Sequence, residues 1–182
     1  VICCVHHAKN LDLPPNMLDK ISIVEIDFSQ PFDANRLPTQ IDIAYFLIHG
    51  MYSSNPHFED NEQAIAQRFR TYLGIVNAKQ VIYLGRICNS ECLPPIQKAN
   101  LHVETELQKG NYNLTVLRAG LIIGKGSSSF EILRKLVVRS PIILTSRWVN
   151  SKCEPISISN VLDFLIGVMN KENFYNQQYD IG

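Results

Sequence analysis

Strand-like apolar runs alternate with segments of helical periodicity, and this alternation limits the fold more than any other feature of the sequence. Ile41–Ile48 (IDIAYFLI) and Val81–Leu84 (VIYL) are almost wholly apolar, as is typical of strands covered on both faces. Between them, Phe58–Val76 carries a single apolar stripe at helical spacing, made by Ile65, Phe69, Tyr72, Leu73 and Val76. A strand–helix–strand order of this kind predicts a parallel sheet in an α/β domain.

The rest of the chain continues the pattern. Further strands are expected at Val1–Val5, Ile21–Ile26, Leu114–Ala119, Pro141–Leu144 and Tyr179–Ile181. Further helices are expected at Gln97–Lys109, from Ser127–Ser129 to Val138, and at Asn160–Met169. The Pro94-Pro95 pair punctuates the loop before the first of these helices, and Gly110 stops it.

Composition and charge argue against several functional classes. The 182 residues suit one domain, and 17 basic residues balance 17 acidic ones, so the electrostatic signature of a nucleic-acid or membrane-surface binder is missing. No run approaches the roughly 20 apolar residues of a membrane span, and the first ten residues do not form a signal peptide. We therefore expect a cytoplasmic protein with no nucleic-acid or membrane partner.

The cysteines and histidines do not predict a disulfide framework or a metal site. The five cysteines are odd in number and irregularly spaced, and three residues separate Cys88 from Cys92, so no CxxC pair exists. Along a strand, Cys3 and His7 point to one face and Cys4 to the other. Zinc sites need paired ligands and a distant second pair, so no metal is expected.

Four sequence blocks carry a family resemblance. They are Ile23–Phe28 (IVEIDF), Ile41–His49 (IDIAYFLIH), Gln80–Gly85 (QVIYLG) and Tyr112–Gly120 (YNLTVLRAG), followed by the closing Tyr179–Gly182. In this order and spacing the chain resembles the atypical short-chain dehydrogenase/reductases of the NmrA-like and predicted nucleoside-diphosphate-sugar epimerase type. The resemblance implies a Rossmann-type, doubly wound α/β fold, with a mostly parallel sheet, helices on both faces, and NAD or NADP as cofactor.

Aligned with that family, Val1–Val5 is the second strand of the fold. The family's first strand, its G-x-x-G-x-x-G turn and the helix that this turn opens are absent from the sequence. In a sheet of order 3-2-1-4-5-6, the missing strand separates Val1–Val5 from Ile41–Ile48, and unpaired buried backbone groups cost roughly 1–3 kcal/mol each. We therefore expect residues 1–182 to be a single domain truncated at both ends, with residues 120–160 contributing a small substrate-side region. The alternative is that another segment or subunit fills the gap.

The resemblance also implies a set of cofactor-binding residues. Asp27 and Phe28 would contact the adenine, although an Asp at a strand end also caps turns. His6 would lie near the adenosine ribose, where a partly charged histidine discriminates poorly between NAD and NADP. Gly85 would line the cofactor or simply serve a turn. The full set implied is His6, Asp27, Phe28, Ile48, His49, Gly50, Leu84, Gly85, Asn100, Ala119 and Gly120.

The loop at residues 124–130 (GKGSSSF) lies between a strand and a helix, which suits an anion site. It fails the P-loop pattern, because Ala119 stands where the first glycine belongs and Gly126 follows Lys125. In the resembling family this loop borders the substrate cleft, which makes Ser127, Ser128 and Phe130 substrate-side candidates. A plain helix cap is the equal alternative.

The catalytic residues do not match the family. Active members use a Tyr-x-x-x-Lys pair, in which the lysine lowers the pKa of the tyrosine. Ile96 and Asn100 occupy the corresponding positions, and Lys98 lies off the helix face that the pair would share. A proton for any hydride transfer would come from His49, Tyr83, Ser127 or water.

Three functional hypotheses follow. The first is an NAD(P)-binding oxidoreductase or epimerase-like enzyme with non-standard catalytic residues. The second is a non-catalytic, dinucleotide-binding redox sensor or scaffold that acts through a protein partner, which the residues Ile96 and Asn100 favour. The third is a structural subunit without cofactor affinity.

Overall fold

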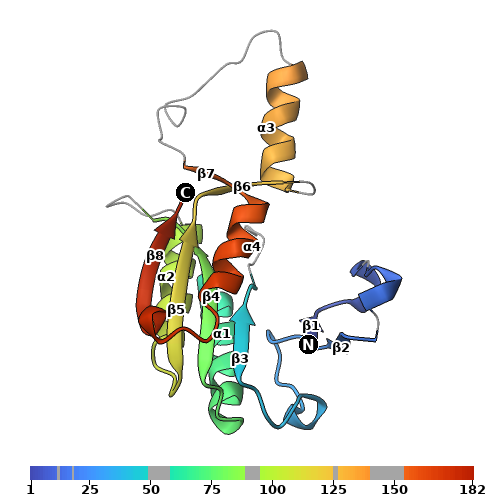
Figure 1. The fold of residues 1–182 in the computed structure, drawn as a ribbon, viewed down its shortest axis with the longest axis vertical. Coiled ribbons are helices and arrows are strands. Elements are labelled where there is room, and N and C mark those ends of the chain that lie inside the picture. The colour runs from blue at the N-terminus through green and yellow to red at the C-terminus, as the bar shows by residue number, and fades with distance from the viewer. Residues whose placement is uncertain (12, 18, 49–57, 89–94, 125–126, 140–153) are drawn as a thin grey trace. The chain divides into compact units, whose positions relative to one another are not determined.

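A computed structural model describes the chain except for positions 12, 18, 49–57, 89–94, 125–126 and 140–153 (Figure 1). The chain divides into two compact units. The first, called here the helical unit, comprises Val1–Asp42, His49–Lys79 and Pro94–Tyr112. The second, the sheet unit, comprises Ile43–Ile48, Gln80–Leu93 and Asn113–Gly182.

Strands and helices alternate through most of the chain. The strands are β1 (Ile2–Val5), β2 (Ser22–Glu25), β3 (Ile43–Phe46), β4 (Gln80–Arg86), β5 (Asn113–Ala119), β6 (Leu121–Ile123), β7 (Pro155–Ser157) and β8 (Gln177–Ile181). The α-helices are α1 (Phe58–Ile75), α2 (Pro95–Leu107), α3 (Ser128–Arg139) and α4 (Ile158–Gly167). Short 3₁₀ helices connect β1 to β2 and β2 to β3.

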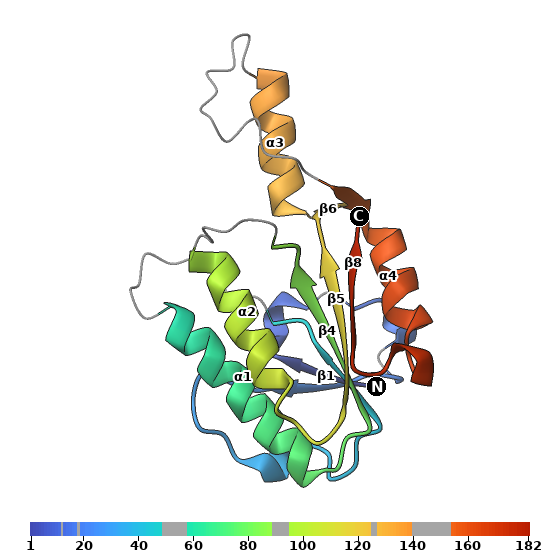
Figure 2. The ribbon, with the colours of Figure 1, turned by 90° about the vertical axis from the view of Figure 1, so that its left-hand side faces the viewer.

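The sheet unit is built on four parallel strands in the order β3-β4-β5-β8, which lie side by side in Figure 1, and Figure 2 shows β4, β5 and β8 from another side. The longest pairing joins β4 to β5 over seven residues, from Gln80 opposite Asn113 to Arg86 opposite Ala119. Ile82 and Leu117 are 0% and 1% exposed, and their neighbours Val81 and Val116 are equally buried, so both strands are covered on both faces. This explains the near-continuous apolar runs in the sequence.

One face of this sheet packs against α4. Ile82 of β4 and Leu117 of β5 form one buried cluster with Val161, Leu165 and Val168 of the helix. The tyrosine hydroxyl of Tyr45 in β3 donates to the Leu165 carbonyl at 3.1 Å. The helix begins after Ser157, whose side-chain oxygen accepts the Asn160 amide as an N-cap.

A buried glutamine ties the sheet to the chain that follows α4. Gln80 is fully buried, and its side-chain nitrogen donates to the Thr115 hydroxyl at 3.0 Å and to the Val168 carbonyl at 3.1 Å. Its side-chain oxygen accepts the Asn170 amide at 2.8 Å. Asn170 has a positive φ of 55°, which asparagine tolerates better than most residues. These bonds satisfy groups that would otherwise be buried without partners.

A second, two-stranded parallel sheet, β6-β7, lies at the end of β5. The sequence did not predict it, because each strand has only three residues and the segments are distant along the chain. The peptide of Glu154 passes so close to Gly120 that a Cβ there would lie 1.8 Å from the Glu154 carbonyl oxygen. Only glycine therefore allows the chain to turn from β5 into β6.

The helical unit contains a parallel pair of strands, β1 and β2, in which Ile2 lies opposite Ser22 and Val5 opposite Glu25. In the described residues, β1 pairs with β2, and β3 pairs with β4, not with β1.

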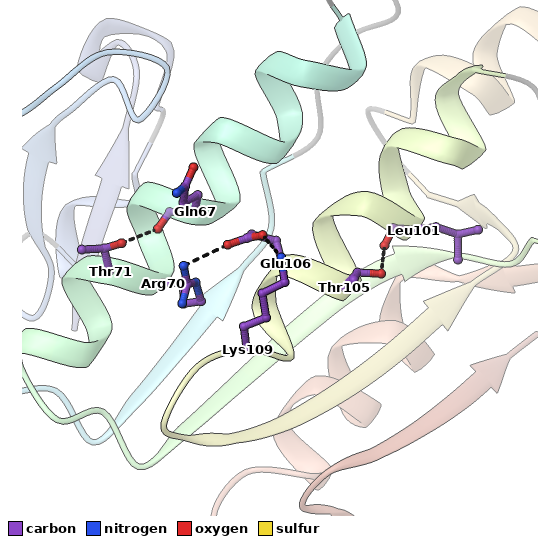
Figure 3. Close-up of polar contacts among 7 residues, drawn as sticks. All are labelled: Gln67, Arg70, Thr71, Leu101, Thr105, Glu106 and Lys109. Atoms are coloured by element: carbon purple, nitrogen blue, oxygen red, sulfur yellow. Dashed lines mark hydrogen bonds and ion pairs between the residues drawn. The ribbon is translucent and has the colours of Figure 1, made fainter.

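Helices α1 and α2 pack together within the same unit. Figure 3 shows Arg70 of α1 reaching Glu106 of α2, at 3.0 Å between Nη2 and Oε1. Lys109 binds the other carboxylate oxygen at 2.7 Å. The Glu106 side chain is only 5% exposed, and its bond with Lys109, followed by the Arg70 charge, holds its pKa below the ordinary value. A buried charge paired on both oxygens joins the two helices.

The helix and strand predictions are confirmed with shifted ends. The predicted stripe of α1 is buried, with all five side chains at most 8% exposed. Helix α2 begins at Pro95 and not at Gln97, because the fixed φ of proline suits the first turn of a helix. It ends at Leu107 and not at Lys109, because the amides of Lys109 and Gly110 donate to carbonyls three residues back, as in a 3₁₀ turn. The strand predicted at Pro141–Leu144 lies outside the described residues.

We predict that Gln80→Met lowers the free energy of unfolding by about 2–3 kcal/mol, because it leaves the Asn170 amide and the Val168 carbonyl without partners. Urea unfolding followed by circular dichroism measures this. Gln177→Met, on the exposed side of β8 in the same sheet, is the matched control and should change the value by less than about 0.5 kcal/mol. Equal effects of the two substitutions would contradict this role of Gln80.

Candidate functional site

The carboxyl ends of the parallel strands meet at one edge of the sheet unit. Strand β4 ends at Arg86, β5 at Ala119 and β8 at Ile181, and the registers place Arg86 opposite Ala119 and Ala119 opposite Ile181. Ligands of open α/β sheets bind outside this edge. Several of the predicted cofactor residues therefore lie at the carboxyl edge of the sheet.

Leu84 and Gly85 lie near the carboxyl end of β4, and their surroundings differ. The Leu84 side chain is 8% exposed and belongs to the core cluster beneath α4, so it contributes packing to the edge. Gly85 lies opposite Arg118, and a Cβ there would meet the Tyr83 ring at 3.0 Å. Gly85 is buried at this position, and its role as a lining residue stays a prediction.

Ala119 and Gly120 are held by backbone bonds. The Ala119 carbonyl accepts the Ile87 amide at 3.1 Å, and the Gly120 amide donates to the Ile181 carbonyl at 3.3 Å. Ala119 is 2% exposed. The glycine at position 120 is explained by the passing Glu154 peptide, which is a requirement of the fold.

Ser127 caps α3. Its hydroxyl donates to the Ile122 carbonyl at 2.8 Å and accepts the Phe130 amide at 3.3 Å, so both functions of the hydroxyl are used locally. The helix cap, one of the two interpretations of this loop, is present, and the substrate-side role stays a prediction. Phe130 is half-buried, and Ser128 begins the helix.

His6 and Asp27 come together at the carboxyl ends of β1 and β2 in the helical unit. The His6 Nε2 lies 3.4 Å from the Asp27 Oδ2, with the side chains 62% and 39% exposed. The other Asp27 oxygen accepts the Ser29 amide at 2.8 Å. Glu25 accepts the Ala8 amide at 2.6 Å, which fixes the chain just after the two histidines.

Asp27 is held in its ionised form. Hydrogen bonding from Ser29 is the main reason that the pKa of Asp27 lies below its ordinary value, and His6 adds a smaller effect in the same direction. An exposed carboxylate that stays charged at neutral pH accepts hydrogen bonds from hydroxyl or amino groups. The strand end also supplies the turn cap that the sequence offered as the alternative reading of Asp27.

Phe28 lies in the interior of the helical unit. Its side chain is 6% exposed, and its ring lies 5.0 Å from that of Phe32 and 5.7 Å from that of Phe69. Arg68 donates to the Phe28 carbonyl at 3.1 Å. The sequence marked Phe28 as an adenine contact, but this ring is packed within the unit.

The remaining candidates divide into three groups. Tyr83, suggested as a proton donor, is 1% exposed and packs on Phe46 at 5.8 Å between ring centroids, so its hydroxyl is held within the protein. Asn100 is half-buried on α2, and Ile48 is half-buried just after β3. His49 and Gly50 lie outside the described residues.

Two arginines near the strand ends were missed by sequence reasoning. Arg86 is exposed at the last position of β4. Arg118, one residue before the end of β5, donates to Gln178 at 2.8 Å and lies 3.8 Å from the Asp180 carboxylate. A cation at a strand end was visible in the sequence, but the register that places Arg86 opposite Ala119 was not.

Within the part of the chain that the structure describes, no group of three or more His, Cys, Asp or Glu side chains is placed to hold a metal ion. None of the described helices has the length and apolar character needed to cross a membrane.

Similarity to solved structures is extensive in shape and low in sequence. The chain is similar to the enzyme WbmG of Bordetella bronchiseptica in complex with NAD and UDP, with a TM-score of 0.72, 11% identity, and coverage of 100% of this chain and 64% of that one. It is also similar to MoeE5 in complex with UDP-glucuronic acid and NAD, with a TM-score of 0.74, 14% identity, and coverage of 100% and 67%.

A third neighbour is the UDP-glucuronic acid 4-epimerase of Bacillus cereus in complex with UDP-glucuronic acid and NAD, with a TM-score of 0.69, 14% identity, and coverage of 92% and 62%. The chain spans less than two thirds of the length of most of these neighbours. No protein-family model and no curated protein matches it. These likenesses confirm the Rossmann-like α/β fold.

We predict that Ser29→Ala raises the pKa of Asp27 toward its ordinary value, because alanine cannot make the hydrogen bond of the Ser29 side chain, which lowers the pKa most, and that His6→Ala raises it less. A ¹³C NMR titration of the carboxyl group measures both. With a lowered pKa in the fold, ionised Asp27 stabilises the protein above the unfolded-state pKa, and this contribution is lost as pH falls through the folded-state value. A larger effect of His6→Ala would contradict the assignment.

Proposed function

We propose that this chain belongs to an NAD(P)-binding protein of the short-chain dehydrogenase/reductase type, an oxidoreductase or epimerase-like enzyme acting on a nucleotide-sugar or similar small molecule. The observation that carries the proposal is the parallel sheet itself, with Gly85, Ala119 and Gly120 at its carboxyl edge. Its neighbours in shape include proteins crystallised with NAD together with UDP or UDP-sugars.

In this proposal, Asp27 and His6 bind the adenosine part of the cofactor. Asp27 offers an ionised oxygen that is partly exposed, beside the exposed imidazole of His6. These groups would accept from and donate to the amino and hydroxyl groups of adenosine. The cofactor, when bound, supplies the hydride acceptor and donor of the reaction. The neighbours in shape were crystallised with NAD, and the proposal covers both NAD and NADP.

In the sheet unit, the proposed ligand edge consists mainly of backbone and small side chains. Gly85 and Ala119 carry no large side chain near the strand ends, and exposed Arg86 places a cation there. A guanidinium suits the phosphate groups shared by dinucleotides and nucleotide-sugars. Arg86 is therefore a proposed phosphate-binding residue.

The proton-transfer group of the proposed reaction is not the usual tyrosine. Ile96 and Asn100 stand at the positions of the Tyr-x-x-x-Lys pair. Ser127 uses its hydroxyl in the α3 cap, and Tyr83 is buried. Of the groups that the sequence offered, His49 and water remain as the proposed proton carriers.

A second candidate function follows from the same substitutions. A protein with the cofactor-binding edge but without the proton donor would bind the dinucleotide and report its presence to a partner protein. The absence of the Tyr-x-x-x-Lys pair from the sequence favours this redox sensor. Binding and turnover measured on one preparation separate the two functions.

The binding arm titrates the protein with NADH and NADPH by fluorescence. We predict that Asp27→Asn weakens binding about tenfold, which corresponds to about 1.4 kcal/mol, because it removes a charged acceptor. Asp33→Asn is the matched control, since Asp33 accepts the Asn35 amide at 3.0 Å in a similar turn. No response to either dinucleotide at millimolar concentration would reject both the enzyme and the sensor.

The turnover arm incubates the protein with NAD and UDP-glucose or UDP-glucuronic acid, and with NADPH and a panel of carbonyl and quinone compounds. The enzyme hypothesis predicts epimerised sugar or loss of NADPH absorbance that exceeds the protein-free rate. Arg86→Ala should raise KM more than it lowers kcat, because a phosphate-binding cation acts on ground state and transition state alike. Cofactor binding without turnover of any compound would favour the sensor.

A further inference from the structure

A cavity of about 220 Å³ lies between helix α4 and strand β8 in the sheet unit, and Figure 2 shows these two elements side by side. Three of its lining side chains are aromatic and partly exposed: Phe164, Phe174 and Tyr179. Three others are at most 5% exposed and belong to the core beneath α4: Leu117, Val168 and Ile181. The cavity therefore has aromatic walls and an apolar floor, and none of these residues belongs to the set proposed to bind the cofactor.

The aromatic walls suit a flat ring. The rings of Phe174 and Tyr179 lie edge to face, with their centroids 5.6 Å apart. Phe164 is 45% exposed, so a further ring in the cavity would remove apolar surface from water. An apolar cavity of about 150 Å³ accepts benzene. This larger cavity therefore has room for one six-membered ring and a short chain.

An unpaired carboxylate lies beside the cavity. Gly182 is part of the lining, and a Cβ on Gly182 would lie 3.2 Å from the Oε2 atom of Glu154. The Glu154 residue is exposed, and no other residue in the described part of the chain donates to its carboxylate. Asp180, the acidic residue of the lining itself, lies 3.8 Å from Arg118 and is already paired. The available charge next to the apolar walls is therefore negative, which is complementary to a cation.

We propose that this cavity binds a small aromatic amine, in which a short chain joins a flat ring to an ammonium group. The ring packs on Phe164, Phe174 and Tyr179, and the ammonium group donates to the Glu154 carboxylate. Specific interfaces between proteins bury roughly 1,200–2,000 Å² in total, far more than a cavity for one ring provides, which favours a small molecule. The inference goes beyond the proposed function and does not rest on it, because no dinucleotide takes part.

The test titrates the ¹⁵N-labelled protein, without dinucleotide, with three compounds that share one ring and differ in charge: 2-phenylethylamine, 2-phenylethanol and phenylacetate. The amine should shift the amide signals of Val168 and Ile181 in a saturable way, with a Kd of about 1 mM for a ligand this small. The alcohol should bind about threefold more weakly and the anion about tenfold more weakly, because an exposed charge pair contributes little and a like charge repels.

Two pairs of variants assign the contacts. Glu154→Gln should weaken binding of the amine about threefold and leave the alcohol unchanged. Asp163→Asn, which removes an exposed carboxylate of α4 outside the lining, is its matched control and should change neither. Phe164→Ala should weaken all three compounds about fivefold, because it removes an aromatic contact. Ile166→Ala, on the same helix, 64% exposed and outside the lining, should have no effect.

Three outcomes would overturn the proposal. The first is the absence of saturable shifts at amine concentrations about tenfold above the expected Kd. The second is equal affinity for the amine and for phenylacetate, which would leave Glu154 without a role. The third is a shift of the cavity amides with protein concentration alone, together with a dimer in sedimentation velocity, which would assign the cavity to a second copy of the chain.

Discussion

Parallel pairing of β4 with β5 is the constraint on which the rest of the structure depends. Seven consecutive pairs fix the register from Gln80 to Arg86, and this register places the strand ends that carry Gly85, Arg86 and Ala119 at one edge. A one-residue slip would move every side chain of the strand to the opposite face, and the close packing on both buried faces would no longer fit it. The bonds of Gln80 to β5 and to the chain after α4 secure the opposite end.

Much of the fold was predictable because its signals are local. The apolar runs of β3 and β4 and the stripe of α1 follow directly from strand and helix geometry. The β6-β7 pair was not predictable, since three-residue strands have no pattern of their own and depend on a turn at Gly120 that the Glu154 peptide requires. The observed ends of α2 differ from the predicted ends for equally local reasons, which are the conformation of Pro95 and the tight last turn.

The sequence predicted where the candidate site lies better than it predicted what each side chain contacts there. The resemblance assigned Asp27 to the adenine and His6 to the adenosine ribose, and in the structure the two side chains lie 3.4 Å apart. It could not foresee that Phe28 packs among aromatic rings or that Ser127 uses its hydroxyl in a helix cap, because burial and capping depend on tertiary contacts. Sequence analysis overlooked Arg86, because nothing in the sequence marks an arginine as lying at the sheet edge until the strand register is known.

The central proposal is that the carboxyl edge of this parallel sheet binds a dinucleotide. The most direct measurement is an amide NMR spectrum of the ¹⁵N-labelled protein recorded with and without NAD. Binding at the carboxyl edge predicts chemical-shift changes for the amides of Gly85, Arg86 and Gly120. The amide signals of Gln80 and Asn113, at the amino ends of the same strands, should stay unchanged. Shifts confined to the amino ends, or a spectrum unchanged at saturating cofactor, would contradict it.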